Sequence, residues 1–94
     1  MELTTFRLRE GVDENAFLAA DAAVQAFHHR QPGLLRRTTA RDTSSGDWLV
    51  VILWASWPHA DAAVQAGRAD EAVQSFAAMI DRASIAVRRF ETLD

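Results

Sequence analysis

The chain has 94 residues, of which 49% are hydrophobic, with thirteen acidic side chains, ten arginines, no lysine and a formal net charge of -3. Because it contains no cysteine, disulfides, cysteine-based metal sites and thiol chemistry are excluded, and the acidic balance argues against a nucleic-acid partner. No apolar run approaches the roughly 20 residues of a membrane span and the N-terminus lacks a signal-peptide pattern, so we expect one cytoplasmic domain over residues 1–94 and no membrane partner.

The N-terminal third predicts a strand followed by an amphipathic helix. Residues 2–9 alternate between the two faces that a strand presents. Asp13 stands where a helix N-cap belongs, and Pro32 with Gly33 follows the end of the helix. Between these limits, apolar residues recur at three- and four-residue steps: Phe17, Ala20, Val24 and Phe27.

The middle of the chain predicts a hairpin whose second strand is the most apolar stretch of the sequence. Residues 34–41 suit an edge strand, and the turn-forming residues 42–47 join them to the stretch Trp48–Trp57 (WLVVILWASW). Both faces of this stretch are apolar: Leu49, Val51 and Leu53 project from one side, and Trp48, Val50, Ile52 and Trp54 from the other. We expect helices to cover one side and a second subunit the other, and the pattern leaves open which side meets the partner.

The C-terminal half predicts further helical structure and a last strand. Ser56 can cap a helix that Gly67 interrupts, and Asp70 offers a second start. The residues expected to face inward are Ala60, Ala63 and Val64, then Val73, Phe76, Met79 and Ile80. These signals fit either one helix with a break near Gly67 or two consecutive short helices. Residues 84–92 alternate again and predict the last strand.

The resulting order, β-α-β-β-α-β, is that of the ferredoxin-like split βαβ arrangement of α+β proteins. Right-handed crossovers then place the first and third strands at the centre of a four-stranded antiparallel sheet. The two outer strands carry the pairs Arg36-Arg37 and Arg88-Arg89, which edge positions tolerate. Strand alternation directs one arginine of each pair toward the helices and the other away from them.

Three stretches of the sequence carry a family resemblance. They are the helix from Ala16-Phe17 onward, the Gln31-Pro32-Gly33-Leu34 entry to the second strand, and the Leu53-Trp54-Ala55-Ser56 exit from the third strand into an alanine-rich helix. Over its whole length the chain resembles the antibiotic-biosynthesis-monooxygenase-like branch of the dimeric α+β barrel superfamily. The resemblance implies a homodimer whose two sheets pack face to face, and a substrate cavity between each sheet and its own helices.

The same resemblance bears on cofactors. Haem-degrading members of the superfamily use an Asn, a Trp and a His at positions matched approximately by Phe6, Ala63 and Val73, none of which can take those roles. The quinone-forming monooxygenases of the family need neither metal nor flavin, because a deprotonated phenolic substrate reacts with oxygen in a tight apolar pocket. We therefore expect no cofactor, and the absence of HxH or HxxxH spacing argues against a metal site.

Candidate site residues combine one base with an apolar wall. His28 borders the apolar stripe of the first helix and is the predicted general base, because imidazole titrates near neutrality. Its alternative role is that of a helix-end histidine that interacts with the helix dipole. The predicted ligand-binding residues are Phe6, Phe27, Arg37, Trp54, His59, Phe76 and Met79. For Trp54, Arg37 and His59 the alternatives are core packing, an ordinary salt bridge and a solvated first-turn position.

Two functions are compatible with these residues. The first is a cofactor-independent monooxygenase, or a related small enzyme, acting on a planar aromatic or polyketide-like molecule. The second is a non-catalytic dimeric module that binds a small apolar ligand or only supports assembly. An ionisable side chain inside the cavity separates the two, because the enzyme needs a base there.

Overall fold

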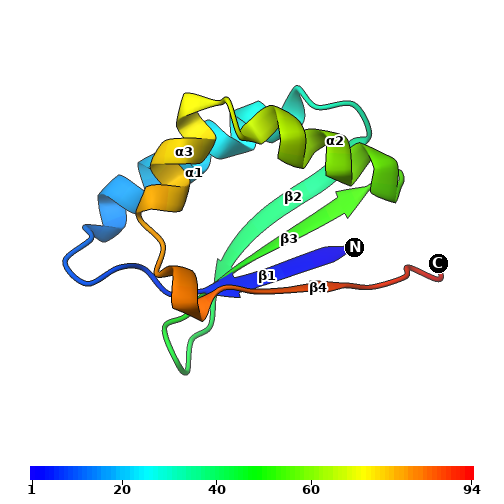
Figure 1. The fold of residues 1–94 in the computed structure, drawn as a ribbon. Helices are drawn as coiled ribbons and strands as arrows, with labels where there is room; N and C mark the ends of the chain where they lie inside the picture. Colours follow the sequence, from blue (N-terminus) through cyan, green and yellow to red (C-terminus); the bar gives the residue numbers. More distant parts are fainter.

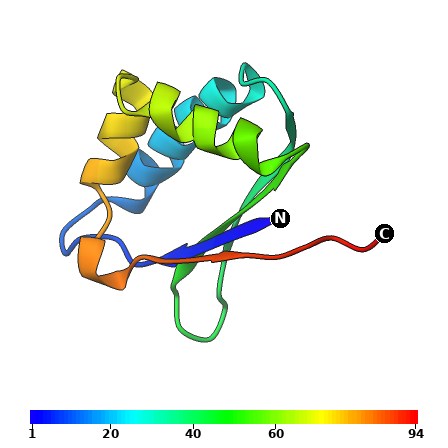
Figure 2. The same cartoon turned by 45° about the vertical axis from the view of Figure 1, so that its right-hand side comes forward.

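The computed structural model describes residues 1–94 and has two layers, an antiparallel sheet and a set of helices on one of its faces (Figure 1). The elements in chain order are β1 (Glu2–Phe6), α1 (Glu14–His29), β2 (Leu34–Arg41), β3 (Trp48–Trp54), α2 (Trp57–Gly67), α3 (Glu71–Ala78), a 3-10 turn (Arg82–Ser84) and β4 (Ala86–Arg89). The four strands lie in the order β2-β3-β1-β4, so the first and third are central. The predicted ferredoxin-like α+β fold is therefore confirmed, and Figure 2 shows that the second face of the sheet carries no helix.

The first and last strands of the chain are shorter than predicted. The first strand was expected over residues 2–9, but beyond Phe6 the chain leaves β3, and Leu8 pairs only with Ile80 in an isolated bridge. The last strand was expected over residues 84–92, but it starts later because the Asp81 carboxylate caps the 3-10 turn at Ala83 N (3.1 Å). Arg7 N donates to Ser84 Oγ (2.8 Å) and Asp81 N to the Arg7 carbonyl (2.9 Å), so contacts between the two segments also decide where the strands end.

Helix α1 forms where its caps and its apolar stripe predict it. The Asp13 side chain accepts a hydrogen bond from Ala16 N (3.0 Å), which satisfies a backbone donor of the first turn. Phe17, Val24 and Phe27 are buried against the sheet side of the molecule. The helix gives way to a loop in which Gly33 has a φ of 80°, the left-handed region that favours glycine.

The region after β3 contains two consecutive helices, which is one of the two arrangements that the sequence allowed. Ser56 caps α2 and Asp70 caps α3, as predicted. Gly67 ends α2 without a positive φ, and a Cβ at this position would meet the Val73 side chain at 3.3 Å. Its small size, rather than backbone freedom, therefore lets α3 pack against the end of α2. Val64 faces the space between the helices and the sheet, as predicted, but it is 51% exposed because this space is open.

Strand β3 is the centre of the core, and the structure separates its two faces. Trp48, Val50, Ile52 and Trp54 point toward the helices and are buried. Leu49, Val51 and Leu53 point to the bare face and are only partly covered. On the helix side, aromatic rings form a cluster with centroid distances from 4.8 to 5.9 Å: Phe6, Phe17, Trp48 and Phe76. The sequence left open which face of this strand the helices cover. The structure shows that the face with Leu49, Val51 and Leu53 is the one without helices.

The helices cover the sheet unevenly. Register places Val87 of β4 beside Thr4, on the face toward the helices, yet Val87 is 56% exposed. Toward β1 and β4 the helix layer therefore leaves a space above the sheet. None of the helices combines the length and apolarity needed to cross a membrane.

Candidate functional site

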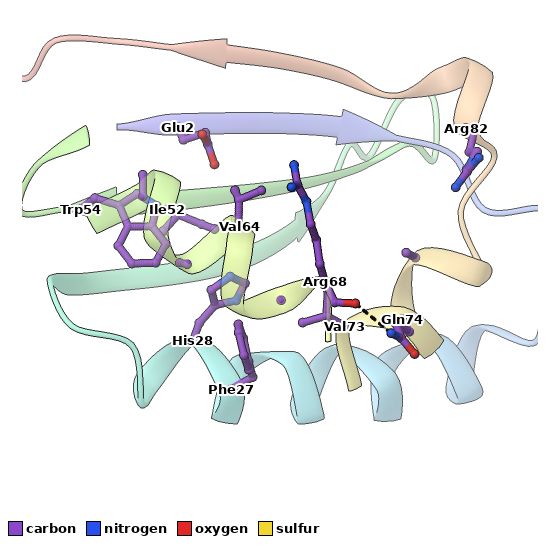
Figure 3. Close-up of a pocket in the computed structure, with 14 residues that line it drawn as sticks. Glu2, Phe27, His28, Ile52, Trp54, Val64, Arg68, Val73, Gln74 and Arg82 are labelled. Carbon is purple, nitrogen blue, oxygen red and sulfur yellow. Dashed lines mark hydrogen bonds between the residues drawn. The ribbon is translucent and has the colours of Figure 1, made fainter. Parts of the chain in front are cut away.

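The space between the helices and the sheet contains a cavity of about 450 Å³ (Figure 3). It is lined by Glu2, Phe27, His28, Ile52, Trp54, Ala60, Ala63, Val64, Gly67, Arg68, Val73, Gln74, Ala77 and Arg82. A second cavity of about 210 Å³ adjoins it and shares four of these residues: Glu2, His28, Ile52 and Val73. His28 is the only histidine among the lining residues of either cavity.

His28 lies at the junction of the two cavities. It projects from the last turn of α1, and its ring centroid is 5.3 Å from that of Phe27 and 5.9 Å from that of Trp54. The Nδ1 atom is buried and has no hydrogen-bond partner. Burial and then the positive charge of Arg37 lower the pKa of His28 from 6.5 to about 4, against opposing effects of the Val24 carbonyl and Asp21. The imidazole is therefore neutral at physiological pH and able to accept a proton.

Arg37 is a buried charge beside this histidine. Its side chain is 1% exposed and pairs with the Asp21 carboxylate on α1 (2.9 Å). Arg37 Nη1 donates to Gln25 Oε1 (3.0 Å) and Thr39 Oγ1 (3.2 Å), and the Thr39 hydroxyl donates to Asp21 (2.8 Å). The network fixes the guanidinium and compensates in part for its burial, although Nε has no hydrogen-bond partner, and Arg37 also lines the smaller cavity.

The apolar wall is divided between the two cavities. Phe27 and Trp54 line the larger cavity, and Phe6 and Phe76 line the smaller one. The indole Nε1 of Trp54 is buried without a hydrogen-bond partner. If a rearrangement brings an acceptor to this N–H, a hydrogen bond forms. Its favourable free energy is large because the interior has a low dielectric constant.

Two predicted ligand-binding residues lie outside both cavities. The ring of His59 packs against Gly33, and its Nδ1 is 2.7 Å from the Ser56 hydroxyl at the start of α2. Met79 packs on the edge of the core, and its carbonyl accepts a hydrogen bond from Arg9 N (2.8 Å). Both residues stabilise the junctions between elements.

The mouth of the larger cavity carries polar residues that the sequence did not single out. Figure 3 shows Arg68 reaching across the cavity toward β1, and Arg82 at the far end. Gln74 Nε2 donates to the Arg68 carbonyl (2.8 Å), which ties the two helices together at their corner. Glu2, on the opposite wall, binds Arg89 Nε (3.1 Å). The helix break at Gly67 was the one sequence signal that pointed here, since Arg68 follows it directly.

The chemistry available in this site is that of a shaped apolar slot with one neutral base. No group of three or more potential metal-ligating side chains occurs in the chain. Planar apolar surfaces from Phe27, Ile52 and Trp54 can contact an aromatic molecule, and His28 can take a proton from it. The fixed positive charge of Arg37 favours an anion formed in this way.

Solved structures share this fold over nearly the whole chain. A variant of SnoaB, a cofactor-independent oxygenase from Streptomyces nogalater, superposes with a TM-score of 0.81 and 17% identity, over 99% of this chain and 91% of that chain. A dimeric ferredoxin-like protein of unknown function from Thermobifida fusca gives a TM-score of 0.76 and 17% identity, over 97% and 88%. Rv0793 from Mycobacterium tuberculosis gives 0.74 and 16%, over 99% and 93%.

These similarities place the chain in a class by its fold. They confirm the fold that the resemblance implied, a ferredoxin-like α+β fold over nearly the whole chain. No protein-family model matches the sequence, and no curated protein matches it either.

Proposed function

We propose that this protein is a cofactor-independent monooxygenase that acts on a planar aromatic or polyketide-like molecule in the cavity between its sheet and its helices. The observation that carries the proposal is His28, a neutral imidazole at the junction of two apolar cavities. The similarity of fold to SnoaB, which is a cofactor-independent oxygenase, supports the same reaction class.

The reaction needs a base because dioxygen reacts readily only with an electron-rich anion of the substrate. His28 takes a proton from the hydroxyl group of a phenol or of the enol form of an anthrone, and the resulting anion transfers electrons to dioxygen. For an anthrone, two C–H bonds break at the reacting methylene carbon and a C=O bond forms; for a naphthol, one ring C–H and the O–H break, and the ring becomes a quinone. One oxygen atom of dioxygen becomes the carbonyl oxygen, and the other leaves as water with both hydrogens. His28 returns its proton to this leaving oxygen.

The low pKa of His28 fits this role once the substrate is bound. In the empty cavity the ring is neutral and a weak base. A phenolate formed within a few ångströms attracts the imidazolium in a low-dielectric space, which raises the pKa of His28 toward the operating pH. Arg37 adds a fixed positive charge that favours the same anion.

Oxygen uptake with a panel of hydroxylated anthrones and naphthols tests the proposal. A positioned general base contributes about 100- to 10,000-fold, so His28→Ala should lower kcat by at least about 100-fold. His29→Ala is the matched control, since His29 is exposed and lines neither cavity. Equal rates for wild type and His28→Ala would show that His28 is not the base. Absence of oxygen uptake with every compound would refute the proposed enzymatic function.

The competing function is a non-catalytic dimeric module that binds a small apolar ligand or supports assembly. The cavity walls serve this role equally well, but it leaves the buried, unpartnered Nδ1 of His28 without a use. Ligand binding with unchanged oxygen concentration in the panel would favour the module.

We also propose that the protein is a homodimer joined through the bare face of the sheet. Leu49, Val51 and Leu53 form an apolar row on this face, and Leu3 of β1 extends it because it pairs with Val51. An apolar patch of this kind is typical of an interface, and a two-fold axis would cover it with its own copy. The dimeric state of the similar Thermobifida fusca protein supports this assembly.

A further inference from the structure

Arginines gather at the open side of the cavity, although the protein as a whole is acidic. Arg68 and Arg82 line the larger cavity. A neighbouring cavity of about 340 Å³ is lined by Arg9 and again by Arg82, and it shares Gln74 and Ala77 with the larger one. Three arginines thus border one connected region of a chain whose formal net charge is -3.

These three arginines have no acidic partners. Ion pairs in this structure use Arg7, Arg37, Arg41 and Arg89, and none uses the three at the cavity. Glu2 is the only carboxylate on the walls of the two cavities, and Arg89 already binds it (3.1 Å). Arg9 donates from Nε to the Ile80 carbonyl (3.3 Å) and Arg68 from Nη1 to Gln65 Oε1 (3.0 Å), so both bind neutral acceptors and keep further donors, and no side-chain bond of Arg82 competes for a ligand.

The arginines lie on one part of the cavity wall, and Glu2 and His28 are the other ionisable side chains that line it. Its inner wall is formed by Phe27, Ile52, Trp54, Ala60 and Ala63. Figure 3 shows Arg82 at the far end from Trp54, and Arg68 reaching across the cavity between them toward β1. A ligand that fills such a space has an apolar planar body and a negatively charged group near the solvent. Guanidinium groups recognise carboxylates with paired, charge-assisted hydrogen bonds.

We propose that the ligand of this cavity carries a carboxylate, bound at the mouth by Arg68 and Arg82, with its aromatic body between Trp54 and Phe27. This inference rests on the proposed function, because it names the substrate class of the same site. The carboxylate end fixes the orientation of the aromatic body relative to His28, so that one particular edge of the ring system meets the base.

A matched pair of small ligands tests the carboxylate directly. 3-Hydroxy-2-naphthoate and 3-hydroxy-2-naphthamide have nearly the same shape and differ by one negative charge. Isothermal titration calorimetry should show about tenfold tighter binding of the carboxylate, as expected for a hydrogen bond to a charged group. The preference should fall as sodium chloride rises, because the mouth is open to solvent.

Variants test whether Arg68 and Arg82 cause the preference for the carboxylate. In R68Q/R82Q the two ligands should bind equally, with the affinity of the amide unchanged, and each single variant should lose part of the preference. Arg30→Gln is the control, since Arg30 is exposed, forms no ion pair and lines neither cavity, and it should retain the full preference. Melting curves verify that the variants are folded.

The outcomes distinguish this inference from the proposed function. Equal affinities for the two ligands in the wild type, or an unchanged preference in R68Q/R82Q, would overturn the carboxylate site and leave the aromatic cavity standing. Failure of both ligands to bind would overturn the aromatic cavity and the carboxylate site together. Binding of the carboxylate without oxygen uptake would retain the inference and point to the non-catalytic module.

Discussion

The two buried ionisable residues near the cavity, His28 and Arg37, solve the problem of burial differently. Arg37 pairs with Asp21 and donates to Gln25 and Thr39, so that only Nε of its guanidinium has no partner. His28 has no such partner for Nδ1, so it avoids the cost of a buried charge by remaining neutral. The two solutions are linked, because the retained charge of Arg37 is itself one cause of the lowered pKa of His28.

This lowered pKa predicts a specific pH dependence of stability. The folded-state pKa of His28 is about 4 and the unfolded value is near 6.5, so between these values the unfolded chain binds the extra proton and stability falls as pH decreases. The full shift corresponds to ~3 kcal/mol, which partial exposure of the ring reduces to about 1–2 kcal/mol. His28→Gln should lack this part of the pH dependence.

Urea unfolding of wild type and His28→Gln at pH 7, 6, 5 and 4 measures the difference. Carboxylates that titrate in both proteins cancel in the comparison. Parallel stability curves for the two proteins would show that His28 titrates normally in the folded state, and would contradict its neutral, buried position.

At the scale of elements, the loop before β2 is held by contacts to the end of β3 and the start of α2. The Gly33 carbonyl accepts a hydrogen bond from Ala55 N (2.7 Å), so the two ends of the β2–β3 pair are fastened together. The His59 ring packs directly on Gly33, where a Cβ would lie 2.3 Å from its Cγ. The hydrogen bond between Ala55 and Gly33 therefore joins two of the stretches that carried the family resemblance, residues 31–34 and 53–56.

Gly33→Ala should be far more destabilising than Gly11→Ala. Both glycines have a positive φ, 80° and 82°, and an alanine in that region costs roughly 1–2 kcal/mol. Nothing lies within 4 Å of a Cβ at Gly11, whereas the His59 ring must move at Gly33. We expect a loss of about 1–2 kcal/mol for Gly11→Ala and at least ~3 kcal/mol for Gly33→Ala.

Denaturant unfolding of the two variants, and of Gly33→Ala in a His59→Ala background, separates strain from collision. His59→Ala removes the ring but keeps the His59 Cβ, which would lie 2.6 Å from the new Cβ, so the cost of Gly33→Ala should fall but stay above the value of Gly11→Ala. Equal costs for the two single variants would mean that the His59 contact is unimportant.

The whole molecule is asymmetric, with helices on one face of the sheet and an apolar row on the other. Val50 and Ile52 are 5% and 7% exposed beneath the helices, while Val51 lies between them in sequence and projects to the bare face. A small chain with part of its apolar surface uncovered gains stability from association. Folding and dimerisation should therefore be coupled, so that the melting temperature rises with protein concentration.

Val51→Asp should dissociate the proposed dimer and strongly lower the melting temperature. A carboxylate at the centre of a two-fold apolar interface is desolvated and faces its own copy, which costs several kcal/mol. Leu18→Asp is the control, because Leu18 is 44% exposed on α1, in the opposite layer. Sedimentation equilibrium at micromolar concentration reports the mass, and a stable, folded wild-type species of 10.4 kDa would contradict the dimer.

The sequence by itself determined the parts of this protein that depend on neighbours along the chain. The caps Asp13, Ser56 and Asp70 and the limits of β2 follow from local hydrogen bonding and from side-chain periodicity, which act within a few residues. Alternation also predicted that one arginine of the pair Arg36-Arg37 points to the helix side, which the structure shows to be Arg37, and the helical stripe placed His28 beside the apolar face that borders the cavity.

Only the tertiary structure decided what depends on residues distant in sequence. The ends of β1 and β4, the bare face of β3 and the pKa of His28 are set by contacts across the fold. The same holds for Arg68 and Arg82, which are separate in sequence and meet at one cavity because α2 and α3 turn back over the sheet. Helix caps and side-chain periodicity do not predict contacts between residues that are distant in sequence, because burial and electrostatic energy depend on distance in space.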